Sequence, residues 1–164
     1  MSTQLRLYFL RHGLADREAF SGDDDRERPL TEEGEIRMER EAEFLADLGL
    51  ELDLILTSPL VRARQTAEIV ARRLDLGEKL SEEPRLDPAF DTERLAGILA
   101  QLDGTVHNVM LVGHEPSFSD VVGEITGGSH VVCKKGGLAR VDVTAGQKPL
   151  GRLVWLLPPK VLLR

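Results

Sequence analysis

Two arginines and two histidines are the residues of this sequence whose types and positions could carry out chemistry. Arg11 and His12 directly follow the apolar run 5–10. Arg62 and His114 lie just beyond two further apolar runs. Because the carboxyl ends of parallel strands share one edge of a sheet, where loops diverge and helices begin, we expect these four side chains to meet there.

These side chains suit the chemistry of a phosphoryl group. Two guanidiniums can hold its oxygens by paired, charge-assisted hydrogen bonds, and helix N-termini add N–H donors. A neutral imidazole nitrogen is a nucleophile that can take the group covalently, while a second imidazole stabilises charge. Phosphoryl transfer depends largely on in-line positioning and on neutralising the equatorial oxygens. We therefore expect no metal and no cofactor, since no acidic cluster has the spacing of a magnesium site.

Helices are expected between these strands. The charged segment 16–28 has no periodicity and is predicted to be an exposed loop, and Thr31 is predicted to cap a helix that stops at Gly49. The apolar face of that helix is expected to include Ile36, Leu45 and Leu48. After the strand 54–56, Ser58 as the cap and Pro59 as the first helical residue predict a helix that continues to about Leu74.

The rest of the chain completes an α/β pattern. Further helices are predicted at about 92–102 and from Pro116 or Ser117 to Gly127, the latter after the strand 109–112. Two apolar segments, one on each side of the turn at 145–149, predict a C-terminal antiparallel hairpin. The expected fold is a three-layer α/β sandwich with a mixed, mostly parallel sheet. The 164 residues have the size of a single domain, 1–164.

The amino-acid composition limits the classes of binding partner. With 28 acidic and 21 basic residues the net charge is −7, which disfavours binding to nucleic acid and to anionic membranes. A site for an anion must therefore be a local positive pocket. Cys133 is the single cysteine and is expected to be buried. The four apolar residues between Arg6 and Arg11 are fewer than the ~7 to 15 of a signal peptide, so we expect a cytoplasmic protein.

Each motif alone has a simpler interpretation: a polar strand end, a helix start or a structural histidine. Their order and their places after apolar strands make coincidence improbable. In them the chain resembles the histidine phosphatase superfamily, with its phosphoglycerate mutase-like fold, and within it the small SixA-type phosphohistidine phosphatases. The resemblance covers nearly the whole chain and rests on Leu10-Arg11-His12-Gly13, Arg28-Pro29-Leu30-Thr31 with Gly34, Ser58-Pro59 with Arg62-Ala63 and Gln65-Thr66-Ala67, and Val112-Gly113-His114-Glu115-Pro116.

The resemblance implies a role for each matching position. His12 is the expected nucleophile, and the residues expected to clasp the phosphoryl group are Arg11, Arg62 and His114. Substrate-binding candidates are Gly13, Ser58 and Arg28. Ser58 is either a hydroxyl donor in the pocket or a helix cap, and Arg28 either meets the substrate at the mouth or forms a structural ion pair.

An acidic proton donor is the one part of the family's active site for which no residue of this sequence aligns. Mutase-like and phosphoester-cleaving relatives carry it after the second helix, where this chain has four acids that we interpret as surface carboxylates: Glu82, Glu83, Asp87 and Asp91. Asp16 and Glu115 are nearer the motifs and could serve instead. Phosphohistidine can accept a proton on its far ring nitrogen and leave as neutral imidazole, whereas an alkoxide needs an acid.

The predicted function is therefore a metal-independent phosphohistidine phosphatase acting on a phosphohistidine-containing protein, such as a histidine-phosphotransfer domain in signal transduction. The alternatives are a small-molecule phosphomonoesterase of the same superfamily and a non-catalytic phospho-ligand-binding module. Lys134 and Lys135 are either a positive rim for an acidic protein surface or part of an exposed turn.

Overall fold

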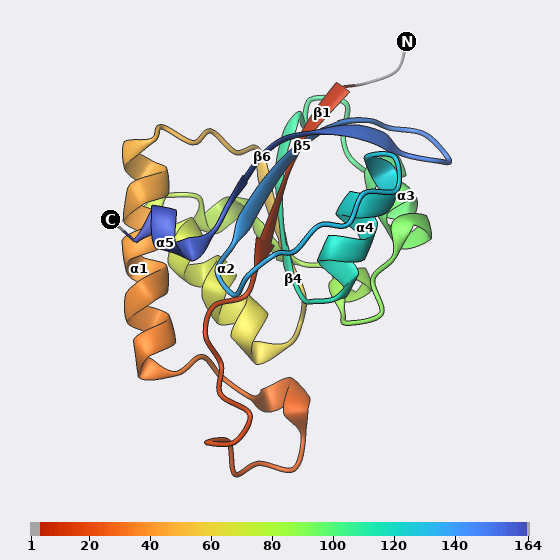
Figure 1. The fold of residues 1–164 in the computed structure, drawn as a ribbon. Helices are drawn as coiled ribbons and strands as arrows, with labels where there is room; N and C mark the ends of the chain where they lie inside the picture. Colours follow the sequence, from red (N-terminus) through yellow and green to blue (C-terminus); the bar gives the residue numbers. More distant parts are fainter. Residues whose placement is uncertain (1–3, 164) are drawn as a thin grey trace.

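The computed structural model describes residues 4–163, and its centre is a six-stranded sheet (Figure 1). Its strands lie in the order β3-β2-β4-β1-β5-β6. Their bounds are β1 (Gln4–Arg11), β2 (Leu54–Thr57), β3 (Leu80–Glu82), β4 (Asn108–Gly113), β5 (Leu138–Thr144) and β6 (Leu150–Leu157). The first four strands are mutually parallel, and β5 and β6 form an antiparallel hairpin beside β1. The predicted mixed, mostly parallel sheet is confirmed.

Helices cover both faces of the sheet and give the expected three layers (Figure 1). One layer contains α1 (Glu32–Asp47), α2 (Val61–Arg73) and the short α5 (Pro159–Leu162), and the other contains α3 (Thr92–Ala100) and α4 (Ser117–Ile125). The described residues also form three short 3-10 helices, η1 (Asp25–Glu27), η2 (Gly77–Lys79) and η3 (Pro84–Leu86). No element is predicted from the sequence for β3 or α5. No helix within residues 4–163 is long and apolar enough to cross a membrane.

The central strands are apolar on both faces because each face packs against helices. Phe9 of β1 lies edge-on to Phe118 of α4, with ring centroids 5.3 Å apart. On the opposite face, Leu10 belongs to the same cluster as Met38 of α1 and Val70 of α2. The sheet is thus buried along the strands that carry the predicted functional residues.

Helix α1 starts as predicted, but of the three residues predicted for its apolar face only Leu45 is buried. The Thr31 hydroxyl accepts a hydrogen bond from the backbone N–H of Gly34 at 3.0 Å, which is the expected N-cap. Ile36 and Leu48, however, are 50% and 53% exposed. The buried stripe is formed by Gly34, Met38, Glu41, Ala42 and Leu45. Ile36 is wrong as a core residue because it lies opposite this stripe at 100° per residue, and Leu48 lies beyond the helix end.

Helix α2 begins later than predicted. Its first residue is Val61 and its N-cap is Leu60, which makes no side-chain cap, so Ser58 does not cap the helix and Pro59 is not its first residue. The helix ends at Arg73, close to the predicted end, and Arg62 lies in its first turn as expected.

The carboxyl ends of β1, β4 and β2 lie side by side. Arg11 is paired with Gly113, and Thr57 with Val112. The ladder continues past the strands, because the N–H of His12 donates to Gly113 O at 3.0 Å and that of Ser58 to Val112 O at 2.9 Å. This register places the residue after each strand at the same edge of the sheet.

Candidate active site

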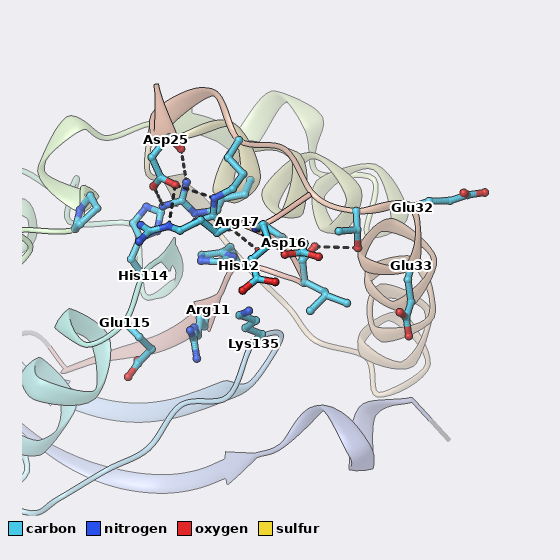
Figure 2. A pocket seen from close by; sticks show the side chains of 17 residues that line it. Arg11, His12, Asp16, Arg17, Asp25, Glu32, Glu33, His114, Glu115 and Lys135 are labelled. Atoms are coloured by element: carbon cyan, nitrogen blue, oxygen red, sulfur yellow. Dashed lines mark hydrogen bonds and ion pairs between the residues drawn. The ribbon is translucent and has the colours of Figure 1, made fainter. Parts of the chain in front are cut away.

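The edge formed by these strand ends opens into a cavity of about 810 Å³ (Figure 2). The structure brings together there the four side chains expected to act on a phosphoryl group, and all four line the cavity: Arg11, His12, Arg62 and His114. Arg28 lines it as well. Of the described residues, four arginines, one lysine and two histidines thus line the cavity together with six carboxylates, so the expected positive charge is not a property of the cavity as a whole.

The imidazole of His12 is held in one tautomer by its own backbone. Its Nδ1 lies 2.8 Å from the carbonyl oxygen of Gly13. A carbonyl oxygen can only accept a hydrogen bond, so Nδ1 carries the proton. In the neutral ring the lone pair is therefore on Nε2, which makes Nε2 the nucleophilic atom.

Burial keeps this ring neutral. His12 is only 5% exposed, and the loss of solvation lowers its pKa to about 2. The hydrogen bond to Gly13 opposes this shift, whereas the positive charges of Arg62 and Arg11 add to it. His12 is consequently a neutral nucleophile, with Nε2 unprotonated, throughout the neutral pH range.

Gly13 supports His12 from behind and does not line the cavity. Its N–H donates to the Thr66 hydroxyl at 3.0 Å, and that hydroxyl donates to the backbone oxygen of Arg62 at 2.7 Å. A Cβ atom at position 13 would lie 2.7 Å from Cγ of Met38, so only glycine fits without moving the side chain. Thr66 thus connects β1 to α2, a role that the sequence analysis did not assign.

His114 is oriented by Ser58. Its Nε2 lies 2.7 Å from the Ser58 hydroxyl, which also accepts the N–H of Leu60 at 3.3 Å. When Ser58 donates to Nε2, the proton of the neutral ring is on Nδ1, which is buried and has no partner within residues 4–163. Burial, followed by the charge of Arg62, lowers the pKa of His114 to about 4. Ser58, itself fully buried, lies behind His114 and does not line the cavity.

Each arginine of the site is anchored through part of its guanidinium. Arg11 donates from Nη1 to the backbone oxygen of Cys133 at 3.0 Å, and Cys133 is buried as expected. Arg62 donates from Nη1 to the backbone oxygen of Asp25 at 2.8 Å and from Nη2 to its carboxylate at 3.2 Å. In the described part of the chain, Nε of both arginines is buried without an acceptor. Nδ1 of His114 is likewise buried without an acceptor, and both guanidiniums keep further N–H groups that can donate to an anion in the cavity they line.

Arg28 has the environment of a structural ion pair. It is 7% exposed, and its Nε donates to the Asp25 carboxylate at 2.8 Å while Nη1 donates to Ala15 O at 2.5 Å. Asp25 was assigned no role from the sequence. The available signal was weak: an acid three residues before Arg28 in a loop rich in charges.

Two carboxylates line the cavity near the motifs, Asp16 and Glu115 (Figure 2). Asp16 accepts the N–H of Glu18 at 2.9 Å. Glu115 accepts the N–H of Ser119 at 3.1 Å and its hydroxyl at 2.5 Å, and burial raises the pKa of Glu115. The raised pKa of Glu115 favours the protonated carboxyl group that a proton donor requires.

The four acids after the second helix do not line the cavity. Glu82 pairs with Arg64, Glu83 with Arg85 and Asp87 with Arg94, while Asp91 caps α3. Within residues 4–163 no group of three or more histidines, cysteines and acids is arranged to hold a metal ion.

The turn of Lys134 to Gly137 forms one border of the site. Gly137 N–H donates to Lys134 O at 2.6 Å, as expected of a tight turn, and both lysines are exposed. Lys135 lines the cavity (Figure 2). The turn is joined to the carboxyl end of β1, because Gly136 N–H approaches the carbonyl oxygens of Arg11 and His12 at 3.2 and 3.1 Å.

Comparison with known proteins agrees with this site. The family model described as histidine phosphatase superfamily (branch 1) matches residues 7–115. A Picosynechococcus protein described as uncharacterized is 39% identical over 139 residues, 82% of each chain. Phosphohistidine phosphatase SixA of Escherichia coli is 31% identical over 125 residues, 76% of each chain. A solved structure of the protein histidine phosphatase SixA complexed with tungstate has a TM-score of 0.85 at 28% identity, covering 96% of this chain and 99% of that one. The chain therefore belongs to the histidine phosphatase superfamily, whose members are phosphatases.

Proposed function

We propose that this protein is a phosphohistidine phosphatase that acts through a phosphohistidine intermediate on His12 and needs no metal. One observation carries the proposal: Nδ1 of His12 is fixed as a donor to Gly13 O at 2.8 Å, which leaves Nε2 unprotonated in a cavity lined by arginines. The relatives named for phosphohistidine support the choice of substrate.

In the first step, Nε2 of His12 attacks phosphorus and a new P–N bond forms. The P–N bond of the substrate breaks, and its electron pair returns to the substrate nitrogen. Because the far nitrogen of the substrate ring already carries a proton, the group departs as neutral imidazole. Arg11, Arg62 and His114 line the cavity and supply donors to the phosphoryl oxygens, whose charge the two guanidiniums neutralise.

In the second step, water attacks phosphorus and the P–N bond to His12 breaks. The proton on Nδ1 of His12 stays in its hydrogen bond to Gly13 throughout, so the phosphorylated ring is already in the form that leaves as neutral imidazole. The water proton goes to the released phosphate. Neither step then requires a dedicated general acid.

A phosphomonoester would place a different demand on the site, because a departing alkoxide needs a proton. Glu115 favours this second candidate function: it lines the cavity, is half-buried and has a raised pKa. In this alternative, Glu115 gives its proton to the leaving oxygen. General acid help of this kind is worth ~100-fold to 10,000-fold in rate.

The proposed partner is a phosphohistidine-containing protein such as a histidine-phosphotransfer domain, in the cytoplasm. Lys135 at the border of the cavity supports contact with an acidic part of such a protein, because its ammonium group is exposed. Arg28 contributes mainly by holding the arginine network, and contact with the substrate is proposed for its remaining N–H groups.

The test is phosphate release from a panel containing a phosphohistidine protein, phosphoserine and phosphotyrosine peptides, and sugar phosphates, with and without chelator. We expect kcat/KM for phosphohistidine to exceed that for sugar phosphate by at least ~100-fold. His12→Ala is the matched inactive control. Preference for sugar phosphate would replace the proposal with the phosphomonoesterase, binding without release would leave a binding module, and loss of activity with chelator would contradict the metal-free mechanism.

A further inference from the structure

Asp25 lines the cavity and links two buried arginines, Arg28 and Arg62, while the exposed Arg17 also pairs with its carboxylate at 3.5 Å (Figure 2). Its carboxylate accepts from Nε of Arg28 at 2.8 Å and from Nη2 of Arg62 at 3.2 Å. Its backbone oxygen accepts from Nη1 of Arg62 at 2.8 Å. One residue of the loop after β1 thus binds both terminal nitrogens of a guanidinium that belongs to α2.

This contact fixes how Arg62 faces the cavity. A guanidinium is planar and rigid, so holding Nη1 and Nη2 sets the directions of all its remaining N–H groups. Nε, on another edge, is buried and has no acceptor in the described residues. Asp25 therefore leaves Arg62 with free donors in a fixed orientation.

Asp25 is itself held in place. Arg28, which is 7% exposed, donates to the Asp25 carboxylate and to Ala15 O, and its backbone N–H donates to Asp25 O at 3.2 Å within η1. A chain of contacts thus runs from Ala15 to Arg28, from Arg28 to Asp25, and from Asp25 to Arg62. The loop after the catalytic strand is thereby connected to the anion-binding arginine.

We propose that Asp25 is a positioning residue of the phosphate site: it orients the guanidinium of Arg62 toward the bound phosphoryl group, and Arg28 keeps Asp25 in place. The opposite role, a carboxylate that competes with phosphate for Arg62, fits less well. The shorter of the two bonds to Arg62 comes from the main chain of Asp25, which cannot withdraw without unwinding η1. The proposal needs the phosphate site only and does not depend on phosphohistidine being the substrate.

The first experiment measures the affinity of the whole protein for inorganic phosphate and for tungstate by calorimetry. We expect Asp25→Ala to weaken binding by ~10-fold to 100-fold, because a misplaced group in a preorganised site costs about this much. Asp25→Asn, which keeps an acceptor oxygen and the backbone contact, should lose less. Asp23→Asn, which removes the same charge from an exposed position of the same loop, should bind as the wild type does. Unchanged or tighter binding by Asp25→Ala overturns the proposal.

A double-mutant cycle separates positioning from direct contact. If Asp25 acts through Arg62, adding Asp25→Ala to Arg62→Ala causes no further loss of phosphate affinity. If the double variant loses phosphate affinity by the product of the two single losses, the proposal is overturned, since Asp25 would then act without Arg62. The NMR chemical shift of the Arg62 Nε–H group gives a third readout. This chemical shift should change in Asp25→Ala and should remain at its wild-type value in Asp23→Asn. A wild-type protein that binds phosphate but ignores phosphohistidine would end the proposed function and leave these comparisons intact.

Discussion

The rings of His12 and His114 lie with their centroids 5.3 Å apart and their planes tilted by 54°. The pairing of Arg11 with Gly113 across β1 and β4 brings the two residues side by side, since each histidine is the next residue of its strand. Their supports differ: a backbone carbonyl holds Nδ1 of His12, and a hydroxyl holds Nε2 of His114. The first arrangement leaves a lone pair on Nε2 of His12, and the second can leave a hydrogen-bond donor on Nδ1 of His114.

The two rings should titrate far below the usual range of histidine. Their pKa values of about 2 and about 4 in the folded protein predict that both rings stay predominantly neutral between pH 8 and pH 5. NMR titration of histidine-labelled protein checks this, with resonances assigned through His12→Asn and the urea-unfolded chain as reference. A His12 ring that titrates near its ordinary pKa would contradict the assignment of a neutral, buried nucleophile.

The same shifts fix the direction of the acid effect on stability. Below about pH 6.5 the unfolded chain, with ordinary histidines, binds more protons at these two positions than the folded protein does. The contribution of the two histidines to the free energy of unfolding should therefore decrease as the pH falls from about 6.5 toward the folded pKa values, and the difference between wild type and His12→Asn isolates the part that belongs to His12. Urea unfolding at several pH values measures it.

Glu115→Gln should separate the two candidate substrates. The amide keeps an acceptor for the N–H of Ser119 but cannot give the proton of a carboxylic acid. We expect hydrolysis of phosphohistidine to change by less than ~3-fold, while hydrolysis of a phosphomonoester falls by ~100-fold or more. Asp120→Asn, an exposed change on α4, is the control. An equal loss on both substrates would show that the imidazole leaving group also needs the acid.

Glu41 should destabilise the protein progressively as the pH rises from about 4.5 to about 8. Its side chain packs in the core beside Gly136, and burial raises its pKa to about 8 while one carboxylate oxygen has no partner in the described chain. Between the unfolded pKa of 4.5 and the folded value of about 8, the folded state binds the extra proton, so stability decreases as the pH rises through this interval.

Glu41→Gln removes that titration. We expect the variant to match the wild type near pH 5 and to exceed its free energy of unfolding at pH 8 by on the order of 2 to 4 kcal/mol. Glu35→Gln, an exposed change on the same helix, serves as the control in urea unfolding. If the difference between Glu41→Gln and wild type does not grow with pH, the carboxyl group is not held protonated.

Local patterns were sufficient to predict most of the fold. The apolar runs marked β1, β2 and β4, and the Thr31 hydroxyl identified the start of α1, because both signals act within a few residues. The three residues of β3 are too few to show periodicity. The four basic side chains could be placed at one edge because parallel strands share it.

Long-range contacts explain what the sequence could not show. Serine before proline usually starts a helix, but Ser58 bonds instead to His114, 56 positions away. Asp25 looked like one charge among many in a loop, because its partner Arg62 lies 37 positions further on. In both cases a tertiary partner decides the role of a side chain whose own surroundings suggest another.

The most direct test of the account is to find the phosphoryl group on the enzyme. Wild-type protein mixed with a phosphohistidine substrate, quenched in alkali within the first turnover and digested, should carry acid-labile phosphate on the peptide that contains His12, bonded to Nε2, and His12→Ala should carry none. Phosphate on Nδ1, phosphate on another residue, or full turnover by His12→Ala would contradict the mechanism.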